Sequence, residues 1–143
     1  QKILVPTDFS EHSALALSYA ADLAKRYDAM LTLVHVYPVV NYAAAEGFAL
    51  YTPQKLAVLL SELSDQLKLE EAELVGQGAR VTSSLVQGDA YHELLELTPE
   101  FDLIVMGTHG RTGFKHALLG SVAEKLVRTA RCPVLTVRNF VHN

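Results

Sequence analysis

One glycine-spaced segment holds the residues best suited to bind an anion. Gly107 and Gly110 are followed, after nine further residues, by the pair Gly120-Ser121. Glycine lets a backbone adopt positive φ and approach a ligand closely, and successive amides in such a turn can converge on an anion. Ser121 opens a predicted helix, whose first N–H groups lack internal partners and whose dipole favours negative charge. The pattern predicts a phosphate cradle, with Arg111 of the same loop within reach of the phosphate oxygens.

A carboxylate follows the first apolar run of the chain. Asp8 comes two positions after residues 3–6, which have the composition of a strand buried on both faces. In other nucleotide-binding folds an acidic residue accepts hydrogen bonds from ribose hydroxyls, and we expect Asp8 to do so here. The alternative is that Asp8 only caps the helix that follows, a role that suits Asp well.

The usual catalytic and phosphate-binding signatures do not occur in the sequence. It has no Gly-x-x-x-x-Gly-Lys-Ser/Thr and no Gly-x-Gly-x-x-Gly after the first strand, and no histidine pair has the spacing of a zinc helix. Ser10 and Ser121 lack the Gly-x-Ser-x-Gly context of a hydrolase nucleophile. The single cysteine, Cys132, excludes an internal disulfide and is expected to be a small buried thiol.

Strands and helices alternate along the chain. Strands are predicted at residues 3–6, 31–37, 80–86, 103–106 and 134–137. The first helix is predicted from an N-cap at Ser10 to about Tyr27, and the second begins at Pro53 and is stopped by Gly76 and Gly78. The third is predicted to begin after an N-cap at Asp89 and is limited by Pro99. The fourth is predicted from about Ser121 to Ala130, with Val122, Leu126 and Val127 facing inward. A leucine stripe through Leu56, Leu59, Leu60, Leu63, Leu67 and Leu74 predicts that the second helix packs against a sheet.

This order predicts one doubly wound α/β domain over residues 1–143. Strands that alternate with helices favour a five-stranded parallel sheet, right-handed crossovers and helices on both faces. Ligands bind such sheets at the carboxyl ends of the strands. The turn after the first strand and the glycine segment after the fourth strand both lie at that edge.

Composition excludes two classes of partner. Of the 143 residues, 20% are charged, and the net charge of −4 does not favour binding to nucleic acid. No stretch reaches the roughly 18 apolar residues that span a bilayer, so no membrane partner is expected. The chain opens on a strand pattern without a signal peptide, and a cytoplasmic location is the expectation.

Taken together, these motifs resemble the universal stress protein family, in its ATP-binding branch. The resemblance covers essentially the whole chain and includes Pro6-Thr7-Asp8-Phe9-Ser10, His35-Val36 and the final apolar strand. Its most specific part is Gly, two residues, Gly, nine residues, Gly and then Ser or Thr, which runs from Gly107 to Ser121 without a gap.

The resemblance implies a strand order, a set of ligand contacts and a dimer. The order is 3-2-1-4-5, which makes the first and fourth strands neighbours. The bound nucleotide is ATP, ADP or AMP, with Mg²⁺ held through the phosphates. The residues implied in binding are Pro6 and Thr7 at base and sugar, Asp8 at the ribose, the Val36 backbone at adenine, Met106 and Gly107 beside the nucleotide, and Gly110, Gly120, Ser121 and Val122 around the phosphates. Dimers would form through the fifth strand, Val134 to Val137.

The expected function is that of an adenine-nucleotide-binding stress-response protein, regulatory or chaperone-like rather than a fast enzyme. The sequence shows no identifiable general base, so at most slow ATP hydrolysis or autophosphorylation is expected. Two alternatives stay open as well. The chain could be a dimeric interaction module that works without nucleotide, or an adenylate-forming enzyme of the related α-hydrolase group. The latter usually carries a glycine-rich loop after the first strand, where this chain has Pro6 to Ser10.

Overall fold

The computed structural model describes residues 1–39, 52–109 and 119–139. Its strands are β1 (Lys2–Pro6), β2 (Met30–Tyr37), β3 (Arg80–Gln87), β4 (Leu103–Gly107) and β5 (Val134–Val137). Its helices are α1 (Glu11–Tyr27), α2 (Pro53–Gly76), α3 (Ala90–Leu97) and α4 (Ser121–Thr129), with a short 3-10 turn, η2 (Thr98–Glu100), after α3. The predicted alternation of strands and helices is confirmed.

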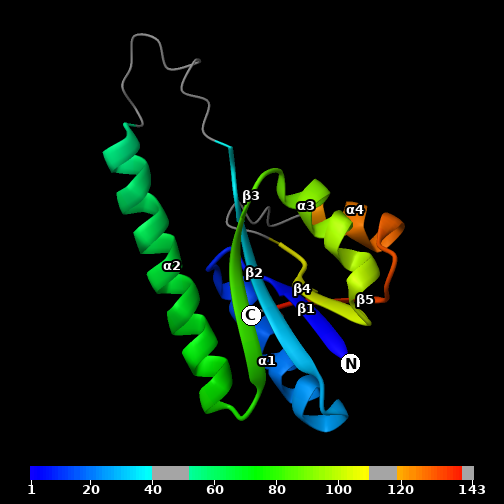
Figure 1. Cartoon of the computed structure of the whole chain (residues 1–143). Coiled ribbons are helices and arrows are strands. Elements are labelled where there is room, and N and C mark those ends of the chain that lie inside the picture. The colour runs from blue at the N-terminus through cyan, green and yellow to red at the C-terminus, as the bar shows by residue number, and fades with distance from the viewer. Residues whose placement is uncertain (40–51, 110–118, 140–143) are drawn as a thin grey trace.

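All strand pairs in the sheet are parallel, and the strand order is β3-β2-β1-β4-β5. Helices α1 and α2 cover one face, while α3 and α4 cover the other (Figure 1). The doubly wound fold and the order implied by the resemblance are therefore confirmed. Because β1 and β4 are neighbours whose chains leave for opposite faces, the crevice between their carboxyl ends is open to a ligand.

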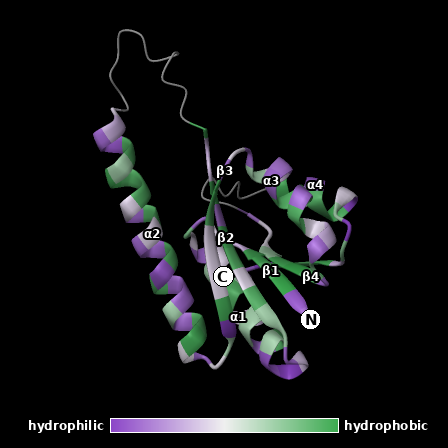
Figure 2. Cartoon of the chain, in the orientation of Figure 1, coloured by the Kyte–Doolittle hydropathy of each residue, from purple (hydrophilic) through white to green (hydrophobic). Residues whose placement is uncertain are grey.

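The central strands have two apolar faces, which explains their unbroken hydrophobic sequences. Val5 packs in a cluster with residues of α1 and α2, whereas Leu4 packs in a second cluster with residues of α3 and α4. Both side chains are fully buried. In Figure 2 the hydrophobic colour dominates β1 and β4, whereas hydrophobic and hydrophilic residues alternate along the helices. Two cores on one sheet hold the strand ends at fixed positions relative to each other.

Of the four α-helices in the described segments, three are capped by a side chain at the N-terminus. The side chains of Ser10, Thr52 and Asp89 accept hydrogen bonds from the backbone N–H groups of Ser13, Lys55 and His92. Such caps satisfy one of the open donors of each helix and stabilise it by about 1 kcal/mol. The predicted caps at Ser10 and Asp89 are confirmed. At α4 the N-cap is Gly120, which offers no side-chain acceptor.

The inward face of α4 differs from its prediction at one position. Leu126 is fully buried as expected, but Val127 is 49% exposed, and Ala123 takes the other buried position. The prediction for Val127 was wrong because a helix turns about 100° per residue, so the neighbour of a buried residue points to one side of the core. Val122 lies at the edge of the buried face, partly buried against the second cluster.

The leucine stripe of α2 meets the sheet over only part of its length. Leu63, Leu67 and Leu74 are buried, whereas the leucines nearer the start of the helix are partly exposed. Cys132 is half-buried beside the second cluster, and burial raises the pKa of its thiol. The expectation of a small buried thiol is confirmed only in part, since some of the surface of Cys132 remains accessible.

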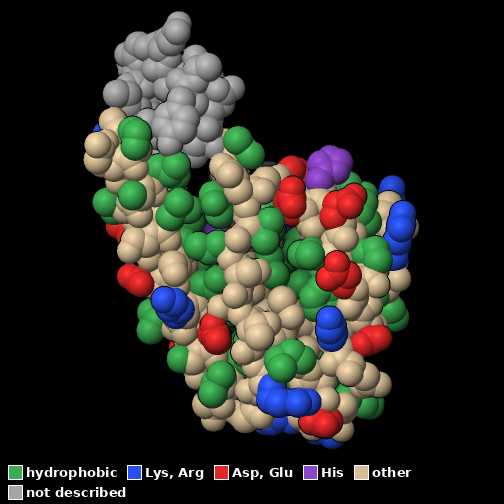
Figure 3. Space-filling model, in the orientation of Figure 1, with side chains coloured by type: hydrophobic (Ala, Val, Ile, Leu, Met, Phe, Trp, Pro, Cys, Tyr) green, Lys and Arg blue, Asp and Glu red, His purple; other side chains and the backbone are tan. Residues whose placement is uncertain are grey.

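The surface carries acidic and basic side chains side by side, as the composition predicts. On the face shown in Figure 3, acidic and basic side chains are interspersed. Among the helices of the described segments, none is both long enough and apolar enough to cross a membrane.

Candidate functional site

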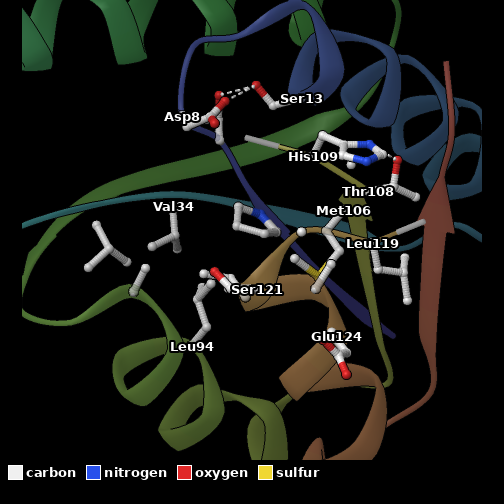
Figure 4. Close-up of a pocket in the computed structure, with 18 of the residues that line it drawn as sticks. Asp8, Ser13, Val34, Leu94, Met106, Thr108, His109, Leu119, Ser121 and Glu124 are labelled. Carbon is white, nitrogen blue, oxygen red and sulfur yellow. Dashed lines mark hydrogen bonds between the residues drawn. The ribbon is translucent and has the colours of Figure 1, made fainter. Parts of the chain in front are cut away.

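A cavity of about 500 Å³ lies at the carboxyl ends of β1, β2 and β4. Its other walls come from the first residues of α3 and from the start of α4 (Figure 4). Pockets for small ligands and cofactors usually have volumes of about 300–1,000 Å³. The cavity is therefore large enough for a small-molecule ligand, and it opens where doubly wound sheets bind one.

Most of the predicted site residues line this cavity. They are Pro6, Thr7, Asp8, Val36, Met106, Gly107, Gly120, Ser121 and Val122. Gly110 and Arg111, the other two predicted contacts, lie outside the described residues. Segments far apart in sequence thus meet at one edge of the sheet. Whether each residue contacts a ligand stays a prediction.

Asp8 is held in a tight turn between β1 and α1. Its Oδ1 accepts hydrogen bonds from the Ser10 backbone N–H at 3.0 Å and from the Ser13 hydroxyl at 3.1 Å. Phe9, inside this turn, has a φ of 65°, a left-handed value that is uncommon for a residue other than glycine. Because the N-cap is Ser10, the alternative that Asp8 itself caps α1 was wrong. Asp8 instead braces the turn while its carboxylate lines the cavity (Figure 4).

Thr7 is tied to the protein at several atoms. Its backbone N–H donates to the Val34 carbonyl at 2.8 Å, and its own carbonyl lies 2.7 Å from Nδ1 of His35. Its hydroxyl, in a side chain only 5% exposed, donates to Oε1 of Glu70 on α2 at 3.1 Å. Thr7 therefore joins β1 to β2 and α2 through its hydrogen bonds.

Two glycines in the second half of the site are required by close packing. A Cβ on Gly107 would lie 2.8 Å from the backbone oxygen of His12, and one on Gly120 would lie 3.0 Å from the oxygen of Thr108. Among the described glycines, positive φ occurs at Gly78 and Gly88 and not at these two. Gly107 therefore does not use the positive φ that glycine allows. It is needed because β4 passes against the first turn of α1.

Within the part of the chain that the structure describes, no side chain caps the first backbone N–H groups of α4. Gly120 has extended φ and ψ of −69° and 162°, and it is followed by Ser121, whose side chain is drawn on the cavity wall in Figure 4. Open N–H donors and the positive end of the helix dipole stabilise an anion at this end of the cavity. Asp8 lies on the other side of the same cavity (Figure 4).

Between these polar ends the wall of the cavity is largely apolar. The apolar contributors are Val34, Val36, Ala90, Leu94, Met106, Leu119 and Val122. A cavity of this kind fits a ligand that has an apolar ring, hydroxyl groups and an anionic tail. Such a ligand would place the anion at α4 and the hydroxyls at Asp8.

Several lining residues were not predicted from the sequence. They are Ser13, Val34, His35, Ala90, Leu94, Thr108, His109, Leu119, Ala123 and Glu124. Thr108 and His109 lie inside the glycine segment, so their position in the motif was an available signal. Leu94 and Ala90 come from α3, whose apolar pattern indicates only that it packs on the sheet. Their place in the wall depends on how α3 crosses the end of β2.

Comparison with known proteins decides the family. The family model for the universal stress protein family matches residues 1–138. The chain belongs to the universal stress protein family. It is 35% identical to the universal stress protein MJ0531 of Methanocaldococcus jannaschii, over 96% of this chain and 82% of the relative. It is 33% identical to the universal stress protein YxiE of Bacillus subtilis, over 96% and 98%.

Solved structures of this family share the fold along the full chain. The structure of MJ0577, solved to assign its biochemical function, superposes with a TM-score of 0.83 at 30% identity, covering 99% of this universal stress protein and 98% of that chain. A universal stress protein in complex with cAMP superposes with a TM-score of 0.71 at 26% identity, covering 98% of each chain. The family resemblance seen in the motifs is confirmed.

Proposed function

We propose that this universal stress protein binds an adenine nucleotide, ATP or AMP, in the cavity between Asp8 and the start of α4. The observation that carries the proposal is the pairing of these two features across one cavity. The ribose hydroxyls would donate to the Asp8 carboxylate, and the phosphates would accept from the N–H groups of the α4 start and from Ser121. Mg²⁺, where it accompanies ATP, would be held through the phosphates.

The apolar wall is the proposed adenine subsite. Val34, Leu94 and Met106 are nearly fully buried, and they border the cavity beside Val36. An adenine ring placed there would bury its faces against apolar side chains, and the Val36 backbone would read its edge. A related universal stress protein, 26% identical, was solved with cAMP, which also carries adenine.

The proposed role is regulatory or chaperone-like, with slow ATP hydrolysis at most. Two carboxylates of the described residues line the cavity, Asp8 and Glu124. Asp8 accepts hydrogen bonds from Ser10 and Ser13, and Glu124 accepts one from Arg128 at 2.7 Å. Both carboxylates are thus already engaged with protein donors, which supports a binding role with slow hydrolysis at most.

The direct test is calorimetric titration with ATP and Mg²⁺ and, separately, with adenosine, which lacks phosphates. In the Ser121→Ala variant, ATP should bind several-fold to about tenfold more weakly, as expected for loss of one charge-assisted hydrogen bond, while adenosine affinity stays unchanged. Ser61→Ala, on the exposed side of α2, is the matched control. Equal ATP affinity in all three proteins would remove Ser121 from the phosphate site, and no binding of either ligand to the wild type would refute the proposal.

We also propose that the protein pairs through β5 into a dimer. β5 is an edge strand of the sheet, and Leu135 within it is 38% exposed. An apolar edge with unpaired backbone groups favours pairing with a second strand. This arrangement would equally serve an interaction module that works without nucleotide, so the two proposals are tested separately.

A further inference from the structure

A chain of hydrogen bonds links two carboxyl groups through two hydroxyls beneath the cavity. Glu70 on α2 accepts from the Thr7 hydroxyl at 3.1 Å, and Asp8 accepts from the Ser13 hydroxyl at 3.1 Å. The two hydroxyl oxygens lie 3.2 Å apart. The chain therefore runs from Glu70 through Thr7 and Ser13 to Asp8 (its last link is dashed in Figure 4).

The number of protons in this chain is informative. Three links join the four groups, but the two hydroxyls supply only two hydrogens when both carboxyls are ionised. Ser13 also lies within 3.0 Å of the Ser10 carbonyl, a further acceptor that needs a hydrogen. One added proton, on a carboxyl group, would complete the chain, because each hydroxyl could then both donate and accept.

Glu70 is the group best placed to take that proton. Its Oε2 is buried and has no hydrogen-bond partner among the described residues. Burial raises the pKa of Glu70, the Thr7 hydrogen bond lowers it, and the negative charges of Glu73 and Asp8 raise it further. Of the elements around it, β2 contributes His35, which contacts the Thr7 backbone, and α1 contributes Ser13. The carboxylate of the neighbouring Glu71 accepts a hydrogen bond from the Ser83 hydroxyl of β3.

We propose that Glu70 is a positioning residue of the nucleotide site, which acts on Asp8 through Thr7 and Ser13 and couples nucleotide affinity to the uptake of one proton. This inference rests on the proposed function, because Asp8 is the proposed ribose contact. With Glu70 protonated, the donors run in one direction from Glu70 to Thr7, Ser13 and Asp8. The Asp8 carboxylate then keeps its brace, and the repulsion between the two acids is removed.

The sign of the pH effect follows from this arrangement. A protonated Glu70 favours the Asp8 conformation that is hydrogen-bonded to Ser13 and able to bind the ribose. Binding of the ribose therefore raises the affinity of Glu70 for its proton, and protonation of Glu70 raises the affinity for the ribose by the same factor. Affinity should therefore increase as the pH falls from about 8 through the raised pKa of Glu70 toward the ordinary carboxyl range. Each pKa unit by which the ligand shifts Glu70 corresponds to a tenfold change in affinity.

The test compares the adenosine affinity of the wild type and Glu70→Gln across this range. Adenosine has no phosphate to titrate, and Gln keeps a donor and an acceptor without the charge, so it imitates the protonated acid. We expect the wild type to bind about threefold to tenfold more weakly than Glu70→Gln at the alkaline end and equally well at the acidic end. Glu62→Gln, an exposed change on the same helix, should behave as the wild type does.

A third variant separates the hydrogen-bonded chain from a direct electrostatic effect. Ser13→Ala removes the link between Thr7 and Asp8 and leaves the Glu70 charge in place. In a Ser13→Ala background the ratio of affinities with and without Glu70→Gln should no longer change with pH. A ratio that still changes would show that the charge acts through space, and it would overturn the role of the chain.

A measurement without ligand distinguishes failure of this inference from failure of the proposed function. Since the pKa of Glu70 is raised in the folded protein, folding favours its protonated form. The free energy of unfolding of the wild type, relative to Glu70→Gln, should fall as the pH rises from the ordinary carboxyl range through the raised pKa. If adenosine binds but its affinity ratio is flat with pH, the inference fails alone. If neither adenosine nor ATP binds at any pH, both proposals fail, even with this stability profile intact.

Discussion

Gly107 at the end of β4 lies directly against the backbone of His12 in α1. A Cβ at position 107 would come within 2.8 Å of the His12 oxygen, a contact that requires the backbone to move. We expect Gly107→Ala to destabilise the fold by about 1–3 kcal/mol, the range for overpacking at a close contact. Urea denaturation measures this change, and the separation of β4 from α1 should also lower nucleotide affinity.

A matched glycine provides the control. At Gly76, near the end of α2, an added Cβ meets nothing within 4 Å. Gly76→Ala should therefore be neutral or stabilise the protein by up to about 1 kcal/mol, because Ala is a better helix former than Gly. Equal losses at the two positions would mean that the contact with His12 does not explain Gly107.

Asp8 has both a structural and a proposed ligand role, which two substitutions separate. Asp8→Asn keeps an oxygen that accepts from Ser10 and Ser13 but loses the charge, so adenosine should bind about tenfold more weakly, the cost of a charge-assisted hydrogen bond. Its free energy of unfolding should change little. Asp8→Ala also leaves the two donors without an acceptor and should cost about 1–2 kcal/mol of stability. Adenosine titration and denaturation of both variants provide the measurements, and an unchanged adenosine affinity in Asp8→Asn would rule out the ribose contact.

The attachment of α4 depends on one face of the helix. Leu126 is fully buried whereas its neighbour Val127 is 49% exposed. Leu126→Ala should therefore cost about 2–5 kcal/mol, the range for a large-to-small change in a core, and Val127→Ala should stay within about 0.5 kcal/mol, as at other surface positions. Thermal or urea unfolding of the pair tests the register of α4. Similar losses in the two variants would contradict this register.

The sequence was sufficient for the parts of the site that follow local rules. Apolar runs identified the strands, and they placed the residues directly after β1 and β4 at one edge of a parallel sheet; that these two strands are neighbours was implied only by the family resemblance. Glycine followed by serine marked the start of α4. Each of these predictions depends on a few neighbouring residues, and each agrees with the structure.

Contacts between distant segments could not be read in the same way. Glu70 is separated from Thr7 by 63 positions along the chain, and its Glu-rich surroundings on α2 are typical of an exposed helix face. The packing constraint that requires glycine at position 107 was missed because the contacting residue, His12, lies in α1 and not in the glycine segment. Val127 was misplaced because helical spacing fixes the period of a buried stripe but not where the stripe is centred.

The geometry of β5 makes the proposed dimer testable at a single backbone N–H. The carbonyls of Pro133 and Val137 accept hydrogen bonds from the N–H groups of Ile104 in β4 and of Thr108 just after it. By the two-residue period of a strand, the backbone groups of Leu135 also face β4. The backbone N–H and carbonyl of Val134 and Thr136 therefore face away from the sheet. These outward groups are the ones that a second copy of the strand would pair with.

Thr136→Pro removes one outward N–H and leaves the bonds between β4 and β5 in place. Proline lacks the donor that an edge needs for pairing, so we expect light scattering after size exclusion to give a monomer for this variant and a dimer for the wild type. Thr136→Val keeps the N–H and should remain dimeric. A Thr136→Pro protein of unchanged mass would exclude pairing through β5, and ATP titration of the same variant would show whether nucleotide binding needs the second copy.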